Sequence, residues 1–125
     1  MRKKLFAMLG LGCIIAVLLV ACGSASNGPN PVHMNAGNFV QNSITIKKGE
    51  SITLINDNLF VAHTIANGTW ENSTAHTARE ASAPEINDVK IDGNSSVTIG
   101  PFTTAGTFKL YCTVHAGMNL TVIVQ

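Results

Sequence analysis

Short runs in which polar and apolar residues alternate are the feature that most limits how this chain can fold. Alternation over a few residues predicts β-strands with one buried face, and there is no convincing helical period beyond the N-terminal segment. Two pairs of runs flank the polar turns Lys47–Glu50 and Asp92–Asn94, and we expect each pair to form a hairpin. Many short strands at regular spacing indicate an all-β fold, an antiparallel β-sandwich. The runs cover residues 43–46, 51–54, 89–91, 97–99, 107–111 and 120–124.

Residues 71–87 interrupt this regular spacing. They read as a long irregular insert, with one helical turn expected near residues 77–81.

The N-terminus has the pattern of an export signal. A basic start, Arg2–Lys4, precedes an apolar run from Leu5 to Val20, and small residues precede Cys22. This arrangement is typical of a bacterial lipoprotein signal, so we expect residues 1–21 to be cleaved and Cys22 to carry a lipid. An uncleaved membrane anchor is the alternative, because the run is close to the minimum length for a bilayer span. Both interpretations place the remaining chain outside the cytoplasm, anchored to a membrane and facing the periplasm or the cell exterior.

The exported part divides into a tether and one domain. Residues 22–31 are rich in Gly, Ser, Asn and Pro and are expected to be flexible, and residues 32–125 form the domain. From residue 22 onward there are five basic and seven acidic side chains, a net charge of −2 with neutral histidines. The absence of a basic stripe argues against a nucleic-acid partner. We expect a monomer.

Cys112 is the one cysteine of the mature chain without an assigned role. Cys13 leaves with the signal and Cys22 is expected to carry the lipid. A lone thiol in an oxidising compartment tends to be oxidised or to form a disulfide, and this domain has no partner for one. A bound metal ion would explain its presence.

Two more potential metal ligands follow closely, His115 and Met118, in the connection between two expected strands. His63, at the edge of a short apolar strand, is the best candidate for a second imidazole. Two imidazoles, one thiolate and a weak axial thioether are the donors of an electron-transfer copper site. Zinc is the competing metal, but it rarely uses a thioether, and its structural sites favour paired cysteines.

The motif Tyr111-Cys112-x-x-His115-x-x-Met118, with a single upstream His63, resembles the cupredoxins, the family of plastocyanin, amicyanin and azurin. The resemblance covers nearly the whole mature chain. It implies a Greek-key sandwich with one type 1 copper ion, held by His63, Cys112, His115 and Met118. It also implies one-electron shuttling between redox proteins.

The resemblance further implies that electrons leave through His115, which lies at the surface inside an apolar patch. Plausible members of that patch are Leu59, Phe60, Ala116 and Gly117. A small apolar surface suits transient docking of redox partners.

Four further residues, Thr64, His33, Met34 and His76, carry polar or sulfur groups outside this proposed ligand set. Many cupredoxins have asparagine after the first histidine ligand, whereas this chain has Thr64, whose hydroxyl can donate a similar hydrogen bond. His33 and Met34 could bind a second copper ion, but a solvated pair is the favoured interpretation. His76 is expected to be solvated too.

Two rival functions remain. A copper-delivery lipoprotein would bind the ion without passing electrons, but such a protein needs an exposed, exchangeable site rather than a thiolate in a constrained loop. A metal-free adhesion sandwich leaves Cys112 unexplained. Paired carboxylates and a nucleophile–base pattern are both missing from the sequence, so we do not expect an enzyme.

Overall fold

The computed structural model describes residues 28–125, and in that range it contains nine strands and no helix. The expected signal peptide, Cys22 and most of the expected tether lie outside the described residues. No helix within residues 28–125 has the length and hydropathy needed to cross a bilayer. The strands are β1 (Pro31–Met34), β2 (Ser43–Ile46), β3 (Ile52–Asn56), β4 (His63–Glu71), β5 (Thr74–Thr77), β6 (Val89–Ile91), β7 (Ser96–Ile99), β8 (Gly106–Cys112) and β9 (Asn119–Val124).

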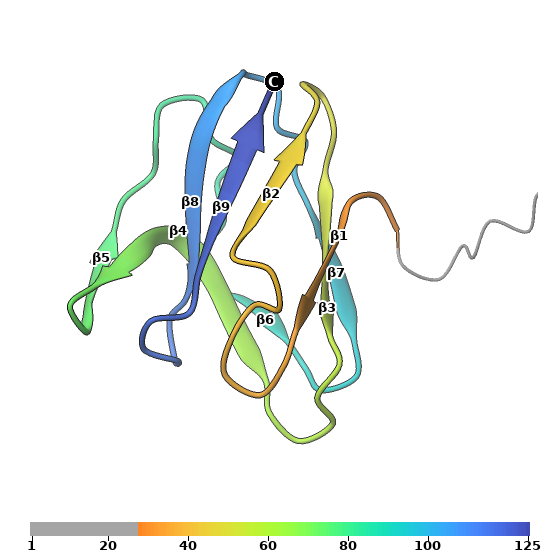
Figure 1. Ribbon diagram of the computed structural model, residues 1–125, viewed down its shortest axis with the longest axis vertical. Helices are drawn as coiled ribbons and strands as arrows, with labels where there is room; N and C mark the ends of the chain where they lie inside the picture. Colours follow the sequence, from red (N-terminus) through yellow and green to blue (C-terminus); the bar gives the residue numbers. More distant parts are fainter. Residues whose placement is uncertain (1–27) are drawn as a thin grey trace, which may run out of the picture.

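The strands form two sheets (Figure 1). One has three strands in the order β1-β3-β7, and the other has six, in the order β2-β9-β8-β4-β5 with β6 paired to β4. The expected all-β sandwich is therefore confirmed. The pairs β1–β3 and β2–β9 are parallel, whereas the other five pairs are antiparallel, so the sheets are mixed rather than purely antiparallel.

Both expected hairpins are wrong. β2 pairs with β9 and β3 with β1 and β7, so the turn Lys47–Glu50 crosses from one sheet to the other. In the same way β6 pairs with β4 and β7 pairs with β3, so the turn Asp92–Asn94 also crosses from one sheet to the other. Alternation reports that a strand has a buried face, but it does not say which neighbour the strand pairs with.

The expected helical turn near residues 77–81 is also wrong. β4 continues to Glu71, and β5 pairs back onto it in antiparallel register from Gly68↔Thr77 to Glu71↔Thr74. All four residues of β5 are exposed, so their sequence carries no alternation that would mark a strand. Residues 78–88 then return to β6 without regular structure.

The last two strands show how the sequence pattern builds the core. In β9, Leu120, Val122 and Val124 are buried while the residues between them are partly exposed. In β8, Phe108 and Cys112 face the same core, because every second side chain of a strand points to the same side. The alternation thus directs the thiol of Cys112 into the interior at the end of β8.

The N-terminal boundary of the folded unit lies slightly earlier than residue 32. β1 begins at Pro31, within the range expected for the tether. The side-chain amide of Asn30 donates to the carboxylate of Glu50 and to the carbonyl of Ser51, at 3.1 and 2.8 Å. Asn30 is therefore part of the sandwich.

Candidate metal centre

Three potential metal ligands converge at one end of the sandwich. Cys112 Sγ lies 3.2 Å from His115 Nδ1 and 3.7 Å from His63 Nδ1, and the two Nδ1 atoms are 3.2 Å apart. In the described residues 28–125 this is the one cluster of three such ligands, with all their ligand atoms within 4.8 Å of one another. The structure therefore brings together three of the four residues expected from the sequence.

Strand pairing explains how His63 reaches a cysteine that is 49 residues away. Ile65 of β4 lies opposite Cys112 of β8, and His63 points to the same side of β4 as Ile65. The His63 imidazole therefore points into the same core as the Cys112 thiol, one inward-facing position further along β4. His63 and Cys112 are both fully buried.

The hydrogen bonding of His63 leaves one ring nitrogen free for a metal. His63 Nε2 lies 2.8 Å from the carbonyl oxygen of Asn35, which can only accept, so Nε2 carries the proton. Nδ1 then has a lone pair, directed at Cys112 and His115. Burial lowers the pKa of His63, and His115 lowers it further, against the opposite effect of the bond to Asn35. The imidazole therefore stays neutral near pH 7, the form that binds metals.

The loop after β8 is closed by its own backbone. The amide of Cys112 donates to the carbonyl of Met118 at 3.0 Å, and the amide of Met118 donates to the carbonyl of His115 at 3.2 Å. Gly117 adopts φ +78°, which glycine accepts without strain. The Met118 side chain is fully buried in the same core cluster as Cys112, whereas His115 is half-buried.

These donors fit copper better than zinc. One thiolate and two imidazoles with a buried methionine in the same loop form the donor set of a type 1 copper site. No second cysteine lies in residues 28–125, and the ligand cluster contains no carboxylate. Structural zinc sites typically use several cysteines or histidines in a closed set of four. The arrangement fits a single type 1 copper ion.

Thr64 connects the two halves of the site through its backbone. Its carbonyl oxygen accepts a hydrogen bond from the amide of Thr113 at 2.8 Å. The expected link between β4 and the cysteine loop is therefore present, but it is made by a main-chain group rather than by the Thr64 hydroxyl.

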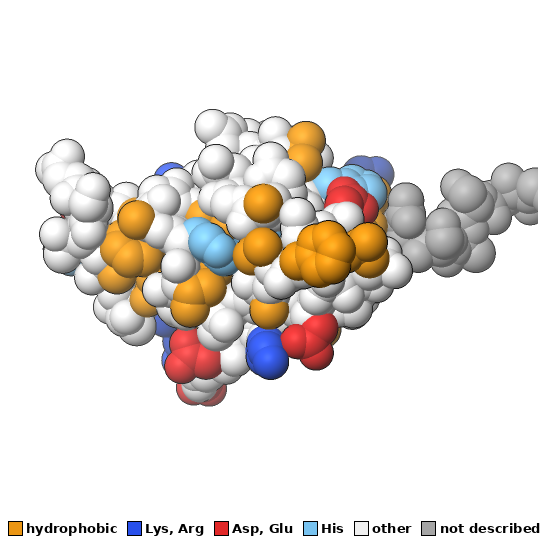
Figure 2. Space-filling view, turned by 90° about the horizontal axis from the view of Figure 1, so that it is seen from below, with side chains coloured by type: hydrophobic (Ala, Val, Ile, Leu, Met, Phe, Trp, Pro, Cys, Tyr) orange, Lys and Arg blue, Asp and Glu red, His pale blue; other side chains and the backbone are white. Residues whose placement is uncertain are grey.

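An apolar surface surrounds the exposed edge of His115. Leu59, Phe60 and Val114 are 64%, 92% and 61% exposed, and Ala116 is exposed as well. The loops that carry them lie at the lower end of the molecule in Figure 1, and Figure 2 shows a histidine on this face with hydrophobic side chains around it. Leu59, Phe60, Ala116 and Gly117 were expected at this surface from the sequence, whereas Val114 was not.

The two remaining histidines lie outside the ligand cluster. His33 Nδ1 is 2.7 Å from the carboxylate of Asp57, and His76 Nε2 is 3.8 Å from that of Glu71. Met34 is fully buried while its neighbour His33 is partly exposed on the other face of β1. The two side chains point in opposite directions, so they do not form a second copper site.

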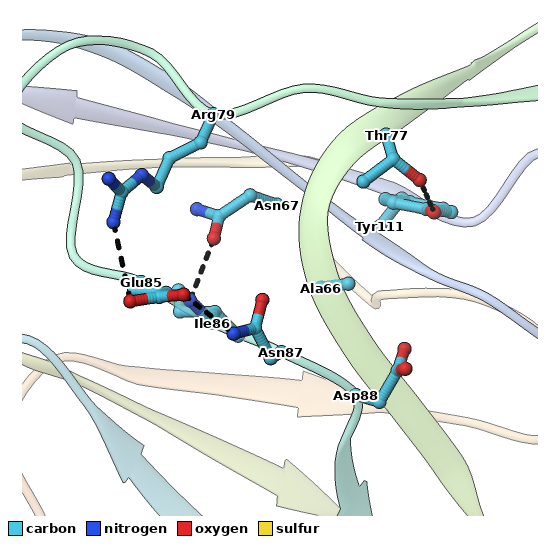
Figure 3. A pocket seen from close by; sticks show the side chains of 9 residues that line it. All are labelled: Ala66, Asn67, Thr77, Arg79, Glu85, Ile86, Asn87, Asp88 and Tyr111. Atoms are coloured by element: carbon cyan, nitrogen blue, oxygen red, sulfur yellow. Dashed lines mark hydrogen bonds and ion pairs between the residues drawn. The ribbon is translucent and has the colours of Figure 1, made fainter.

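Tyr111, next to Cys112, faces the other side of β8. Its hydroxyl is 3.0 Å from the Thr77 hydroxyl, and its side chain is only 4% exposed. It forms one wall of a cavity of about 340 Å³. Figure 3 shows the residues that line this cavity, with Arg79 directed at Glu85 on one side of it. The insert therefore covers Tyr111.

The chain is similar to known copper-binding proteins. The model of the copper binding proteins of the plastocyanin/azurin family matches residues 29–125. A plastocyanin from Ulva prolifera is 34% identical over 89 residues, which are 70% of this chain and 86% of that protein.

Solved structures show the same fold at lower identity. Amicyanin from Paracoccus versutus has a TM-score of 0.58 at 22% identity, over 77% of this chain and 80% of amicyanin. A purple cupredoxin from Nitrosopumilus maritimus also has a TM-score of 0.58, at 19% identity, over 77% of this chain and 99% of that protein. Because the family model spans nearly all described residues, this chain belongs to the plastocyanin/azurin family of copper-binding proteins.

Proposed function

We propose that this protein carries single electrons between redox proteins outside the cytoplasm, with copper held by His63, Cys112, His115 and Met118. The observation that carries the proposal is the convergence of three ligand atoms within 4.8 Å. Two of these residues are fully buried, and the hydrogen bond from His63 Nε2 to Asn35 directs the free nitrogen of His63 toward the thiol.

A bound copper ion supplies a one-electron Cu(II)/Cu(I) couple. The chain's contribution is rigidity: Cys112 and His63 are on paired strands, and the backbone bonds of the loop hold Met118 and His115. Ligands that keep one geometry in both oxidation states make electron transfer fast, because little has to move. Four protein ligands also leave no open position for a substrate, in keeping with an electron carrier rather than an enzyme.

The docking surface in this proposal is the apolar face around His115. The half-buried imidazole is the ligand closest to solvent, and exposed Leu59, Phe60 and Val114 belong to the loops at the same end. A small apolar contact gives short-lived complexes, as an electron carrier requires.

The proposed location rests on the N-terminal sequence. A cleaved signal and a lipid on Cys22 would attach the domain to a membrane through residues 22–27, and the protein would meet its partners as a tethered monomer. We place it in the periplasm or at the cell exterior.

Copper delivery without electron transfer is the second candidate function. Cys112 and His63 are fully buried, which disfavours the rapid ligand exchange that delivery requires. Reversible bleaching of the copper protein by reductant, with the ion retained, would support electron transfer. Loss of the ion to a chelator on each reduction would support delivery.

The absorption spectrum of copper-loaded protein tests the ligand assignment. We expect an intense blue band from charge transfer between the Cys112 thiolate and Cu(II), and its loss in Cys112→Ser. A hydroxyl cannot supply this transition. A colourless wild type, or a blue Cys112→Ser variant, would overturn the assignment.

A further inference from the structure

Trp70, the only tryptophan in the chain, contacts both ends of the loop at residues 112–119, which carries three of the proposed copper ligands. Its indole Nε1–H donates to the carbonyl oxygen of Cys112 at 2.8 Å. Its backbone amide donates to Asn119 Oδ1 at 2.7 Å, and Asn119 Nδ2 donates back to the Trp70 carbonyl at 3.0 Å. Asn119 directly follows Met118, so Trp70 closes the loop that carries three of the proposed ligands.

A change of partner along β4 brings Trp70 to this position. β4 pairs with β8 as far as Asn67 and with β5 from Gly68 onward, and Figure 1 shows it curving away from β8. Gly68 has φ +136°, and a Cβ there would collide with the His76 carbonyl and the Tyr111 ring. A glycine is therefore needed where β4 changes partner.

The indole hydrogen bond has an electrostatic consequence for the site. The positive end of the N–H dipole points at the peptide of Cys112, whose side chain is the proposed thiolate ligand. The oxidised site carries one more positive charge than the reduced site. A nearby positive dipole end therefore disfavours the oxidised form, and partial burial strengthens the effect by lowering the local dielectric.

We propose that Trp70 is a positioning residue that holds the Cys112 carbonyl and raises the reduction potential of the copper site. The inference rests on the proposed ligand set. It predicts that loss of the indole N–H lowers the potential even where the fold and all four ligands are retained.

Ordinary packing is the competing explanation, and the chain offers a matched control for it. The Trp70 ring packs edge-on against Tyr111, with ring centroids 6.0 Å apart at 82°. The Tyr111 hydroxyl bonds to Thr77 and not to Cys112. Tyr111→Phe thus removes one hydrogen bond from the same aromatic pair without changing the group that faces the Cys112 carbonyl.

Voltammetry of copper-loaded Trp70→Phe and Tyr111→Phe distinguishes the two explanations. We expect Trp70→Phe to shift the redox equilibrium toward Cu(II) at least threefold, about 28 mV at 59 mV per tenfold change. Tyr111→Phe should leave the potential unchanged. An unchanged potential in Trp70→Phe, or an equal shift in Tyr111→Phe, would overturn the proposal.

A second measurement avoids dependence on the folding of Trp70→Phe. Because the chain has one tryptophan, growth on 5-fluorotryptophan changes only Trp70 and makes its N–H a stronger donor. The potential should then rise, and an unchanged or lowered value would overturn the proposal. A wild type without the blue band would instead refute the proposed function. If the wild type is blue but neither Trp70→Phe nor the fluorinated indole changes the reduction potential, this inference alone is refuted.

Discussion

Replacing Phe60 with alanine should slow electron self-exchange between two copies of this protein. Self-exchange is transfer from a reduced to an oxidised molecule of the same protein, so it needs no natural partner. If two copies dock through the apolar face around His115, each encounter buries two Phe60 side chains. Phe60 is 92% exposed in the single molecule, so the substitution leaves the core intact.

The expected size follows from the apolar surface removed from water. Full burial of a phenylalanine side chain contributes about 1.5–3 kcal/mol, and a transient contact covers roughly half of it. Two copies of Phe60 then contribute about 1.5–3 kcal/mol to the encounter. At about 1.4 kcal/mol per factor of ten, the self-exchange rate falls roughly 10- to 100-fold.

Line broadening in nuclear magnetic resonance spectra of mixed reduced and oxidised protein measures this rate. The control is Thr103→Ala. Thr103 is exposed and follows Phe102, whose carbonyl accepts a hydrogen bond from the amide of Gly49 at the end of the sandwich opposite His115. Unchanged absorption and potential in Phe60→Ala would show that the copper site is intact. A wild-type self-exchange rate in Phe60→Ala, or an equal loss in Thr103→Ala, would refute docking through this face.

Three further perturbations test the ligands and the anchor. Met118→Gln should lower the reduction potential because an amide oxygen favours Cu(II), whereas Met118→Leu should raise the potential. If voltammetry shows shifts of the same sign in both variants, Met118 is not a ligand. Burial lowers the pKa of His63 in the folded apo-protein, so the unfolded chain binds the proton more readily. The stability that this neutral imidazole contributes is present above about pH 6.5 and is lost as pH falls toward the folded pKa. As pH is lowered, the free energy of unfolding measured with urea should fall less for apo His63→Gln than for the apo wild type. An equal fall in the two proteins would contradict the lowered pKa of His63. Cys22→Ala should release the protein from membranes without changing its spectrum, and fatty-acid labelling that fails to mark the wild type would count against lipidation.

The candidate site could be predicted largely from sequence because its ligands are chemically distinctive. Cys112, His115 and Met118 lie within one loop, and His63 is a histidine at the edge of an apolar strand. The groups that support these ligands could not be predicted in this way. The Asn35 carbonyl that bonds to His63 is a main-chain group, which every residue type provides.

Trp70 was missed for a related reason. The sequence around Trp70 does not distinguish it from an aromatic residue that merely packs in a core. Its contact with Cys112 joins residues that are 42 positions apart in the chain. Only the change of partner of β4 at Gly68 brings the indole N–H to the cysteine loop. A hydrogen bond between distant segments exists only once the strands that carry them are placed.

The amino-acid sequence by itself determined which side chains face the core. The alternation in β8 and β9 directs Cys112 and Leu120 inward whichever strands lie alongside, because successive side chains of any strand point to opposite faces. The tertiary structure alone decided that β2 pairs in parallel with β9 rather than with β3, against the hairpin that the turn suggested. Every strand edge presents the same N–H and C=O groups, so strand partners are selected by the burial that the two complete sheets achieve together.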